Sequence, residues 1–180
     1  MSHALLVIDV QRSFEERPYW TDRDLPAFRD ALCALIGGCV ARRVPVVRVL
    51  HVEDDGAFAP SSGLVTPMDW LPPSHDLDVR KHVHNAFTDT GLDRWLRARK
   101  VERVVVSGIR TEQCCETTTR VASDLGYEVD FVTEATLTFP MTRRGRVFSS
   151  EEIKERTELV LDGRFARVTT VAGALDSLRA

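Results

Sequence analysis

The chain has 180 residues, of which 43% are hydrophobic and 28% charged, and its formal net charge is −3. This length and apolar content predict one folded domain, 1–180, and exclude a disordered chain. The small negative charge excludes the basic surface that nucleic acids and acidic membranes require. No apolar run approaches the roughly 18 residues that span a bilayer. Composition therefore indicates a globular protein that binds neither nucleic acid nor membrane.

The first half of the chain predicts strand, helix, strand and a long loop. Ala4–Ile8 is an apolar strand that ends at Asp9. From residue 26 to residue 43, apolar side chains recur at the spacing of an amphipathic helix, and a proline suits its first turn. Pro45–Leu50 is the second strand. Residues 52–77 are rich in proline and glycine, and we interpret them as one long loop, which in a compact domain usually has a function.

The second half continues the alternation of strands and helices. A short strand at 78–82 and a short helix after Thr90 lead to Arg103–Ser107, a continuous apolar strand typical of a sheet covered on both faces. Ser149 and Glu152 have the spacing of a capping box and predict a helix start. The remaining predicted elements are a helix at 115–125, a strand at 128–132, a strand at 165–169 and a helix at 172–178.

This alternation predicts an α/β fold with a mainly parallel sheet and right-handed crossovers. In such sheets, ligands bind beyond the carboxyl ends of the strands, near a switch in strand order. The rule points to three places: the residues after Ile8, those near Lys81, and the turn after Ser107.

The N-terminal residues show no basic flank followed by a long apolar segment and a cleavage site. We therefore expect no signal peptide, a cytoplasmic protein and four reduced cysteines. Cys33 and Cys39 fall in a predicted helix, where a buried thiol acts as a small hydrophobic group.

Three polar side chains at the strand ends could carry chemistry. A carboxylate at Asp9 is costly to bury unless it is paired, although it could also cap the following turn. Lys81 could equally be a solvated basic residue. Cys114 follows the turn after Ser107 and opens a predicted helix, where the macrodipole favours an anion. We therefore expect the pKa of its thiol to be lowered, as for other thiols at helix N-termini.

The residues around these positions resemble the isochorismatase-like cysteine hydrolase family. The resemblance rests on three motifs in order: Leu5-Leu6-Val7-Ile8-Asp9-Val10-Gln11, Lys81 with Asn85-Ala86-Phe87, and Gly108-Ile109-Arg110-Thr111-Glu112-Gln113-Cys114. It implies a three-layer α/β/α fold with a six-stranded parallel sheet, and a homodimer or homotetramer. It also implies a catalytic triad of Asp9, Lys81 and Cys114. In that mechanism the thiolate attacks an amide-like carbonyl and a thioester forms.

The same resemblance implies a cis peptide bond before Arg110, and an oxyanion hole made by the backbone N–H groups of Arg110 and Cys114. Cys115 takes the place of a common valine and is expected to fill the core. The nicotinamidase branch carries a metal site of the form Asp-x-His after the second strand, followed by a further histidine. Here that region begins His51-Val52-Glu53, and the next histidine is His75. This spacing does not match, so we expect no metal and no cofactor.

The predicted function is hydrolysis of a C–N bond in a small amide, carbamoyl compound or ureide. Phe14, Trp20 and Trp70 fall in loops near the expected pocket and could stack on a flat substrate, or could instead cover the core or a subunit interface. One alternative is a vinyl-ether hydrolase of the isochorismatase type, although such members lack the cysteine. The other is a non-catalytic binding or redox-sensing protein that uses Cys114 and Cys115.

Overall fold

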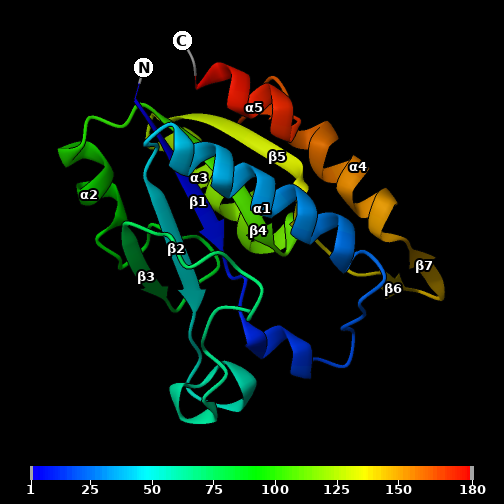
Figure 1. Ribbon diagram of the computed structural model, residues 1–180. Coiled ribbons are helices and arrows are strands. Elements are labelled where there is room, and N and C mark those ends of the chain that lie inside the picture. The colour runs from blue at the N-terminus through cyan, green and yellow to red at the C-terminus, as the bar shows by residue number, and fades with distance from the viewer. Residues whose placement is uncertain (1, 179–180) are drawn as a thin grey trace.

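The predicted apolar runs pair into one six-stranded sheet in the computed structural model, which describes residues 2–178 (Figure 1). Its strands lie in the order β3-β2-β1-β4-β5-β8, and every neighbouring pair is parallel. The strand bounds are β1 (His3–Ile8), β2 (Val46–His51), β3 (Leu77–Lys81), β4 (Arg103–Ile109), β5 (Glu128–Leu137) and β8 (Arg167–Thr169). The predicted α/β fold is confirmed, and the order of the strands reverses direction between β1 and β4.

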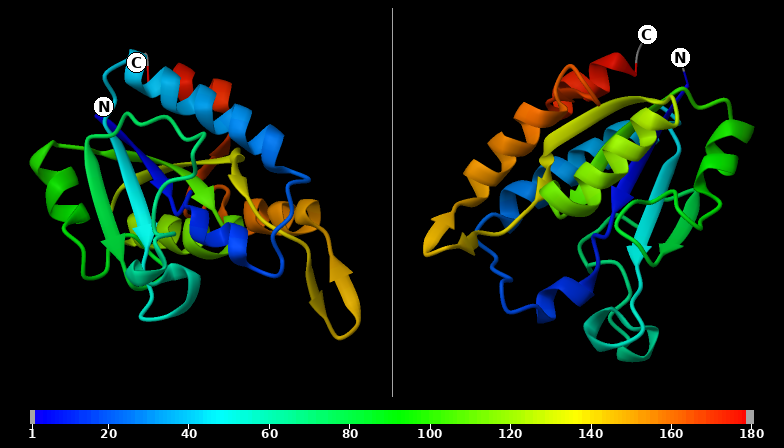
Figure 2. Two further views of the ribbon diagram at one scale, coloured as in Figure 1. Left: turned by 60° about the horizontal axis from the view of Figure 1, so that its bottom comes forward. Right: turned by 180° about the vertical axis from the view of Figure 1, so that it is seen from behind.

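Helices cover both faces of the sheet (Figures 1 and 2). On one face lie α1 (Leu25–Ala41) and α5 (Val171–Ser177). On the other lie α2 (Leu92–Ala98), α3 (Glu116–Asp124) and α4 (Ser150–Leu161). The predicted capping box is present at the start of α4, where Ser149 and Glu152 bond each other's backbone N–H. Within residues 2–178, no helix is both long and apolar enough to cross a bilayer.

The two apolar layers explain why β1 is hydrophobic without interruption. Ala4, Leu6 and Ile8 point into the layer of α2, α3 and α4. The side chains between them, Leu5 and Val7, point into the layer of α1 and α5. Successive strand residues face opposite sides of a sheet, so a strand buried on both sides needs apolar residues at every position.

The structure contains a hairpin that the sequence did not predict. After β5, strands β6 (Met141–Arg143) and β7 (Arg146–Phe148) pair with each other and not with the main sheet. Arg144 and Gly145 form the turn with positive φ, as two-residue hairpin loops require. The hairpin projects from the body of the protein (Figure 2). Its strands are short, and every residue in them except Phe148 is exposed, so the sequence shows no apolar pattern there.

Residues 52–77 are more ordered than the predicted loop. Two 3-10 turns, Gly56–Phe58 and Pro60–Ser62, lie within the segment. The side chains of Phe58 and Met68 are buried, and the backbone N–H of Met68 donates to the carbonyl oxygen of Val10 at 3.1 Å. The segment therefore packs onto the residues that follow β1.

Gly108 is required by the close approach of β4 to β1. Its φ of +123° is a conformation that L side chains rarely adopt. A Cβ atom at this position would lie 2.0 Å from the carbonyl oxygen of Ile8, which is backbone and has little freedom to move. Gly108 thus allows the turn that carries Arg110 and Cys114 to leave β4 beside the end of β1.

We expect Gly108→Ala to lower the free energy of unfolding by at least about 3 kcal/mol, since the backbone conformation alone costs about 1–3 kcal/mol and the clash adds to it. Urea denaturation followed by circular dichroism measures the change. The control is Gly37→Ala in α1, where no atom lies within 4 Å of the new Cβ. That substitution should stabilise the protein by about 0.5–1 kcal/mol. Equal stability of the two variants would contradict this account of Gly108.

Candidate active site

Three strand ends bring together the side chains that the sequence predicts as a triad. Asp9 follows β1, Lys81 is the last residue of β3, and Cys114 lies in the π-helical turn Thr111–Cys115 after β4. The ammonium nitrogen Nζ of Lys81 is 2.8 Å from Oδ2 of Asp9 and 3.5 Å from Sγ of Cys114. The cluster lies at the carboxyl edge of the sheet, where the strand order reverses, as expected for an open α/β sheet.

The Asp9–Lys81 ion pair is fully buried, with both side chains 0% exposed. An isolated charge at this depth would cost several kcal/mol, and the partner charge offsets that cost. Asp9 has a φ of 54°, in the left-handed region that aspartate tolerates better than most residues. This backbone conformation ends the strand at Asp9 and begins the turn that follows.

Besides its ion pair with Asp9 and its hydrogen bond to Cys114, Lys81 has two further hydrogen-bond partners. Its Nζ lies 3.1 Å from Nδ1 of His51 and 3.1 Å from the carbonyl oxygen of Val83. His51 is the last residue of β2, the strand between β1 and β3, and it is paired in register with Lys81. The sequence analysis missed His51 in this role, although it ends a strand as Lys81 does.

Gln11 holds the backbone of His51 from both sides. Oε1 of Gln11 accepts a hydrogen bond from the backbone N–H of His51 at 2.7 Å. Its Nε2 donates to the carbonyl oxygen of the same residue at 3.0 Å. Gln11 is 0% exposed, so these bonds form away from competing water. The end of β2 is therefore fixed to the turn that follows Asp9.

The environment of Cys114 differs from the expected one. The residue lies in the π-helical turn before α3 and is only 7% exposed. Burial raises the pKa of its thiol first, the charge and hydrogen bond of Asp9 raise it further, and Lys81 lowers it. The predicted lowered pKa is therefore wrong for the resting site, because desolvation outweighs the helix N-terminus. The thiol is neutral and lies beside an Asp–Lys pair.

Cys115 occupies the core, as predicted. It is 0% exposed and belongs to the apolar layer formed with α2, α3 and α4. All four cysteines are free thiols. Cys39, on α1, is buried in the apolar layer of α1 and α5, and Cys33, on the same helix, is partly exposed. The vicinal position of Cys114 and Cys115 thus separates one thiol at the polar cluster from one in the core.

The backbone and the side chain of Arg110 have different roles. The peptide bond between Ile109 and Arg110 is cis, as the resemblance implies. The guanidinium group is 3.0 Å from Oε1 of Glu112, and both side chains are more than 90% buried. It also lies 4.7 Å from the ring centroid of Tyr19. The side chain is therefore engaged with the protein, while the backbone begins the turn that carries Cys114.

The three aromatic residues proposed for substrate binding lie in the layer of α1. Trp70 packs edge-on against Phe28 of α1, with centroids 5.8 Å apart, so the structure does not bring it to Cys114. Trp20 packs against Phe139 at 5.3 Å. Phe14 packs against Phe58, which also contacts the ring of His51. Of the three, only Phe14 is linked to the polar cluster, and substrate contact stays a prediction.

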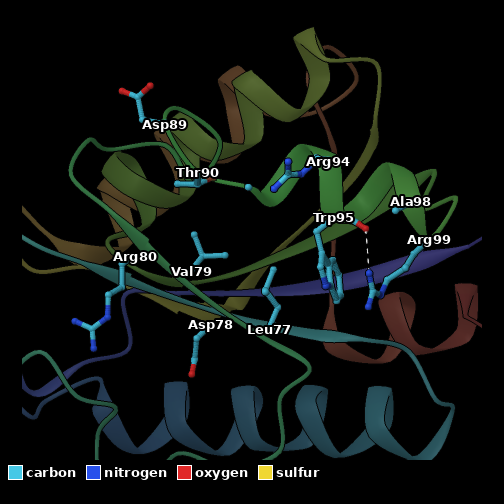
Figure 3. A pocket seen from close by; sticks show the side chains of 11 residues that line it. Leu77, Asp78, Val79, Arg80, Asp89, Thr90, Arg94, Trp95, Ala98 and Arg99 are labelled. Atoms are coloured by element: carbon cyan, nitrogen blue, oxygen red, sulfur yellow. Dashed lines mark hydrogen bonds between the residues drawn. The ribbon is translucent and has the colours of Figure 1, made fainter.

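Two large surface grooves lie away from the triad. One, of about 630 Å³, separates β3 from α2 (Figure 3). There the guanidinium of Arg99 stacks 3.8 Å from the ring centroid of Trp95. The other, of about 820 Å³, lies between the β6–β7 hairpin and α4 and is bordered by the exposed Leu159. The triad belongs to neither groove, and the predicted homodimer or homotetramer stays a prediction.

The residues at the end of β2 and directly after it do not fit a metal site of the nicotinamidase type. Nδ1 of His51 faces Lys81, and its Nε2 lies 3.3 Å from Oε1 of Glu53. Both ring nitrogens are thus engaged with protein groups. In the part of the chain that the structure describes, no three His, Cys, Asp or Glu side chains are grouped to hold a metal ion.

Comparisons with known proteins agree with this fold and site. The model of the isochorismatase domain matches residues 3–172. Nicotinamidase 3 of Arabidopsis thaliana is 39% identical over 179 residues, covering 91% of this chain and 82% of that protein. A solved structure of an isochorismatase-type protein from Burkholderia xenovorans LB400 is 28% identical, with a TM-score of 0.89, covering 98% of this chain and 87% of that one.

A cysteine hydrolase from Pseudomonas syringae pv. phaseolicola 1448A shares the fold, with a TM-score of 0.89 at 24% identity, covering 98% of this chain and 92% of that one. The family model covers nearly the whole described chain, and the strand order and parallel pairing are those that the resemblance implies. The predictions of the fold and of a hydrolase are confirmed, and the chain belongs to the isochorismatase family.

Proposed function

We propose that this protein hydrolyses a carbon–nitrogen bond of a small amide, carbamoyl compound or ureide, with Cys114 as nucleophile. The observation that carries the proposal is the contact of one buried ammonium group with both a carboxylate and a thiol. Nζ of Lys81 is 2.8 Å from Asp9 and 3.5 Å from Sγ of Cys114. A base, a cation and a nucleophile at these distances are the parts that acyl transfer through a thioester requires.

The first chemical step transfers the thiol proton of Cys114 to Asp9 while the sulfur attacks the substrate carbonyl carbon. Because the resting thiol has a raised pKa, a neighbouring base has to take its proton as the attack proceeds. Lys81 then stabilises the negative charge that develops on sulfur. The carbonyl oxygen becomes an oxyanion, which the backbone N–H groups of Arg110 and Cys114 would hold.

The second step breaks the C–N bond. Asp9 returns its proton to the departing nitrogen, which leaves as ammonia or an amine, and a thioester to Cys114 remains. Asp9, again a carboxylate, takes a proton from water as that water attacks the thioester carbon. The acid product leaves, and the proton on Asp9 returns to the sulfur of Cys114. Asp9 serves as base, acid, base and acid in turn, so its position beside sulfur is essential.

The relative from Arabidopsis supports the choice of an amide-like substrate, because it is named as an amidase of nicotinamide. The absence of that branch's His and Asp spacing here favours a different small substrate. Screening small amides, carbamoyl compounds and ureides for release of ammonia tests the proposal. A vinyl ether that gives a pyruvate-type product belongs in the same panel, because that activity is the main alternative.

A redox-sensing role for the vicinal cysteines has less support. Cys115 is 0% exposed and packs in the core, so an oxidant in solution reaches it only if the protein opens. A disulfide switch also has no use for the buried pair of Asp9 and Lys81. Titration of thiols before and after mild oxidation separates this alternative from hydrolysis.

We expect Asp9→Asn and Lys81→Ala each to lower turnover by about 10²–10⁴, the usual contribution of a general acid–base group. Turnover on the substrate found in the screen is the measurement. Lys81→Ala leaves Asp9 buried without its cation, so stability is measured in parallel by urea denaturation. The matched control is Asp130→Asn, which removes another buried carboxylate, paired with Arg167 far from the triad. Near-normal turnover of Asp9→Asn would contradict the triad.

We expect activity to survive exhaustive treatment with EDTA. The physical reason is that both ring nitrogens of His51 already face protein partners, Lys81 and Glu53. Turnover before and after chelation is compared on the same substrate. Loss of activity that zinc or iron restores would contradict this expectation and favour a mechanism like that of the metal-dependent branch.

We expect limited iodoacetamide to alkylate Cys114 first and to abolish activity in proportion. Cys114 is 7% exposed, and Asp9 beside it can take its proton while Lys81 stabilises the thiolate. Cys33, Cys39 and Cys115 should lag far behind: Cys115 is 0% exposed in the core, Cys39 is buried, and the partly exposed Cys33 has a thiol pKa raised by burial. Peptide mapping by mass spectrometry identifies the labelled thiol. Cys114→Ser should be folded and inactive, and Cys115→Val should be folded and active. Labelling of Cys115 before Cys114 would overturn the assignment of the nucleophile.

A further inference from the structure

We propose that His51 is a positioning residue: its neutral imidazole accepts a hydrogen bond from Lys81 and holds the ammonium group between Asp9 and Cys114. This inference rests on the proposed function of Cys114 as nucleophile. His51 occupies the end of β2, between the strands that carry Asp9 and Lys81. Its side chain therefore reaches the triad from the middle strand of the three.

The number of acceptors around Lys81 gives His51 its role. An ammonium group has three protons, and four acceptor atoms surround Nζ here. Asp9 lies at 2.8 Å, Nδ1 of His51 and the carbonyl oxygen of Val83 each at 3.1 Å, and Sγ of Cys114 at 3.5 Å. In the resting site Nζ donates to His51, to the carbonyl oxygen of Val83 and, at the longest distance, to the neutral sulfur of Cys114, while Asp9 is joined to it as an ion pair.

Formation of the thiolate changes only one of these hydrogen bonds. When the proton of Cys114 moves to Asp9, the carboxyl group becomes neutral and the sulfur becomes negative. The hydrogen bond from Lys81 to the sulfur then gains a charged acceptor, while His51 and the carbonyl of Val83 keep the other two protons. These two fixed acceptors hold Nζ in place during the exchange. Without His51, the ammonium is free to move toward Asp9 and away from the sulfur.

The surroundings of His51 fix the tautomer that this role needs. Because Nδ1 accepts from Lys81, the ring proton is on Nε2, which lies 3.3 Å from Oε1 of Glu53. Gln11 fixes the backbone of His51 through two hydrogen bonds. The ring of His84 stacks on that of His51 with an interplanar angle of 4° and centroids 6.3 Å apart. His84 thus restrains the imidazole ring, and Gln11 fixes the backbone that carries it.

Protonation of His51 would reverse its effect on Lys81. Nδ1 would change from acceptor to donor, and a second cation would lie 3.1 Å from the ammonium. The groups that face the ring are Lys81, Asp9, Glu53 and His84. Burial and Lys81 lower the pKa of His51, and Asp9 and Glu53 raise it less. The imidazole is therefore neutral at neutral pH, and thiolate formation weakens as the pH falls through its lowered pKa.

The test measures the rate at which iodoacetamide alkylates Cys114 as a function of pH, which needs no substrate. His51→Leu removes the acceptor and should slow the reaction about 10- to 100-fold, the effect of losing a hydrogen bond to a charged group. His51→Asn keeps an amide oxygen near the position of Nδ1, and its rate at neutral pH should stay within a few-fold of wild type. The matched control is His84→Asn, which changes the stacked histidine that has no bond to Lys81.

The acid side of the pH profile separates positioning from a general loss of packing. The wild-type rate should fall as His51 takes up a proton. The profile of His51→Asn should lack that step and extend to lower pH. His84→Asn should match the wild type. This comparison decides the proposal even if His51→Leu does not fold, which its thermal unfolding curve would show.

The outcomes distinguish this inference from the proposed function. If iodoacetamide does not label Cys114 first in the wild type, the proposed nucleophile is wrong and the role of His51 falls with it. If Cys114 is labelled first, and the profiles of His51→Asn and wild type coincide while folded His51→Leu reacts as fast as His84→Asn, the positioning role is overturned and the hydrolase proposal stands.

Discussion

The site depends on one buried ion pair, that of Asp9 with Lys81, whose Nζ–Oδ2 distance is 2.8 Å. Removing one partner of such a pair costs about 3–5 kcal/mol, because the remaining charge is left without compensation. A protein gains little stability from a pair like this compared with apolar residues of the same volume. Its position at the sheet edge beside a thiol is therefore best explained by chemistry, since the resting thiol needs a base and its anion needs a cation.

The strand order accounts for the convergence of residues that are far apart in the sequence. β1 and β4 are neighbours, so Asp9 lies beside the turn that carries Cys114, and Gly108 permits that close approach. β3 lies two strands beyond β1, so Lys81 reaches Asp9 past the end of β2. A long, flexible side chain suits this span, whereas a shorter residue at position 81 would not reach. His51 at the end of β2 fills the space that the lysine crosses.

Periodicity was sufficient to predict the sheet and most helix positions, because apolar patterns record burial directly. Strand ends pointed to Asp9, Lys81 and Cys114, and only the family resemblance implied that they form a triad. The same rules contain a signal for His51 that went unused: Val47, Val49 and His51 alternate along one face of β2, and that face also carries Val79 and Lys81 on β3. No local pattern in the sequence indicated the hairpin at 141–148 or the packing of Trp70 against Phe28. The positions of exposed, arginine-rich strands such as β6 and β7, and of loop aromatics such as Trp70, depend on tertiary contacts. A local sequence pattern does not contain that information.

The pKa of Cys114 shows how two correct local rules combine. The start of a helix favours a thiolate, and burial disfavours it. A sequence reveals the first effect and conceals the second, and here burial and the charge of Asp9 prevail. A neutral resting thiol is also consistent with the geometry, because a permanent thiolate would compete with Asp9 for the single ammonium group of Lys81. With the proton on sulfur, Lys81 can pair with Asp9 and remain in place until the substrate arrives. Transfer of that proton to Asp9 then forms the thiolate that attacks the substrate, and the ammonium of Lys81 stabilises it.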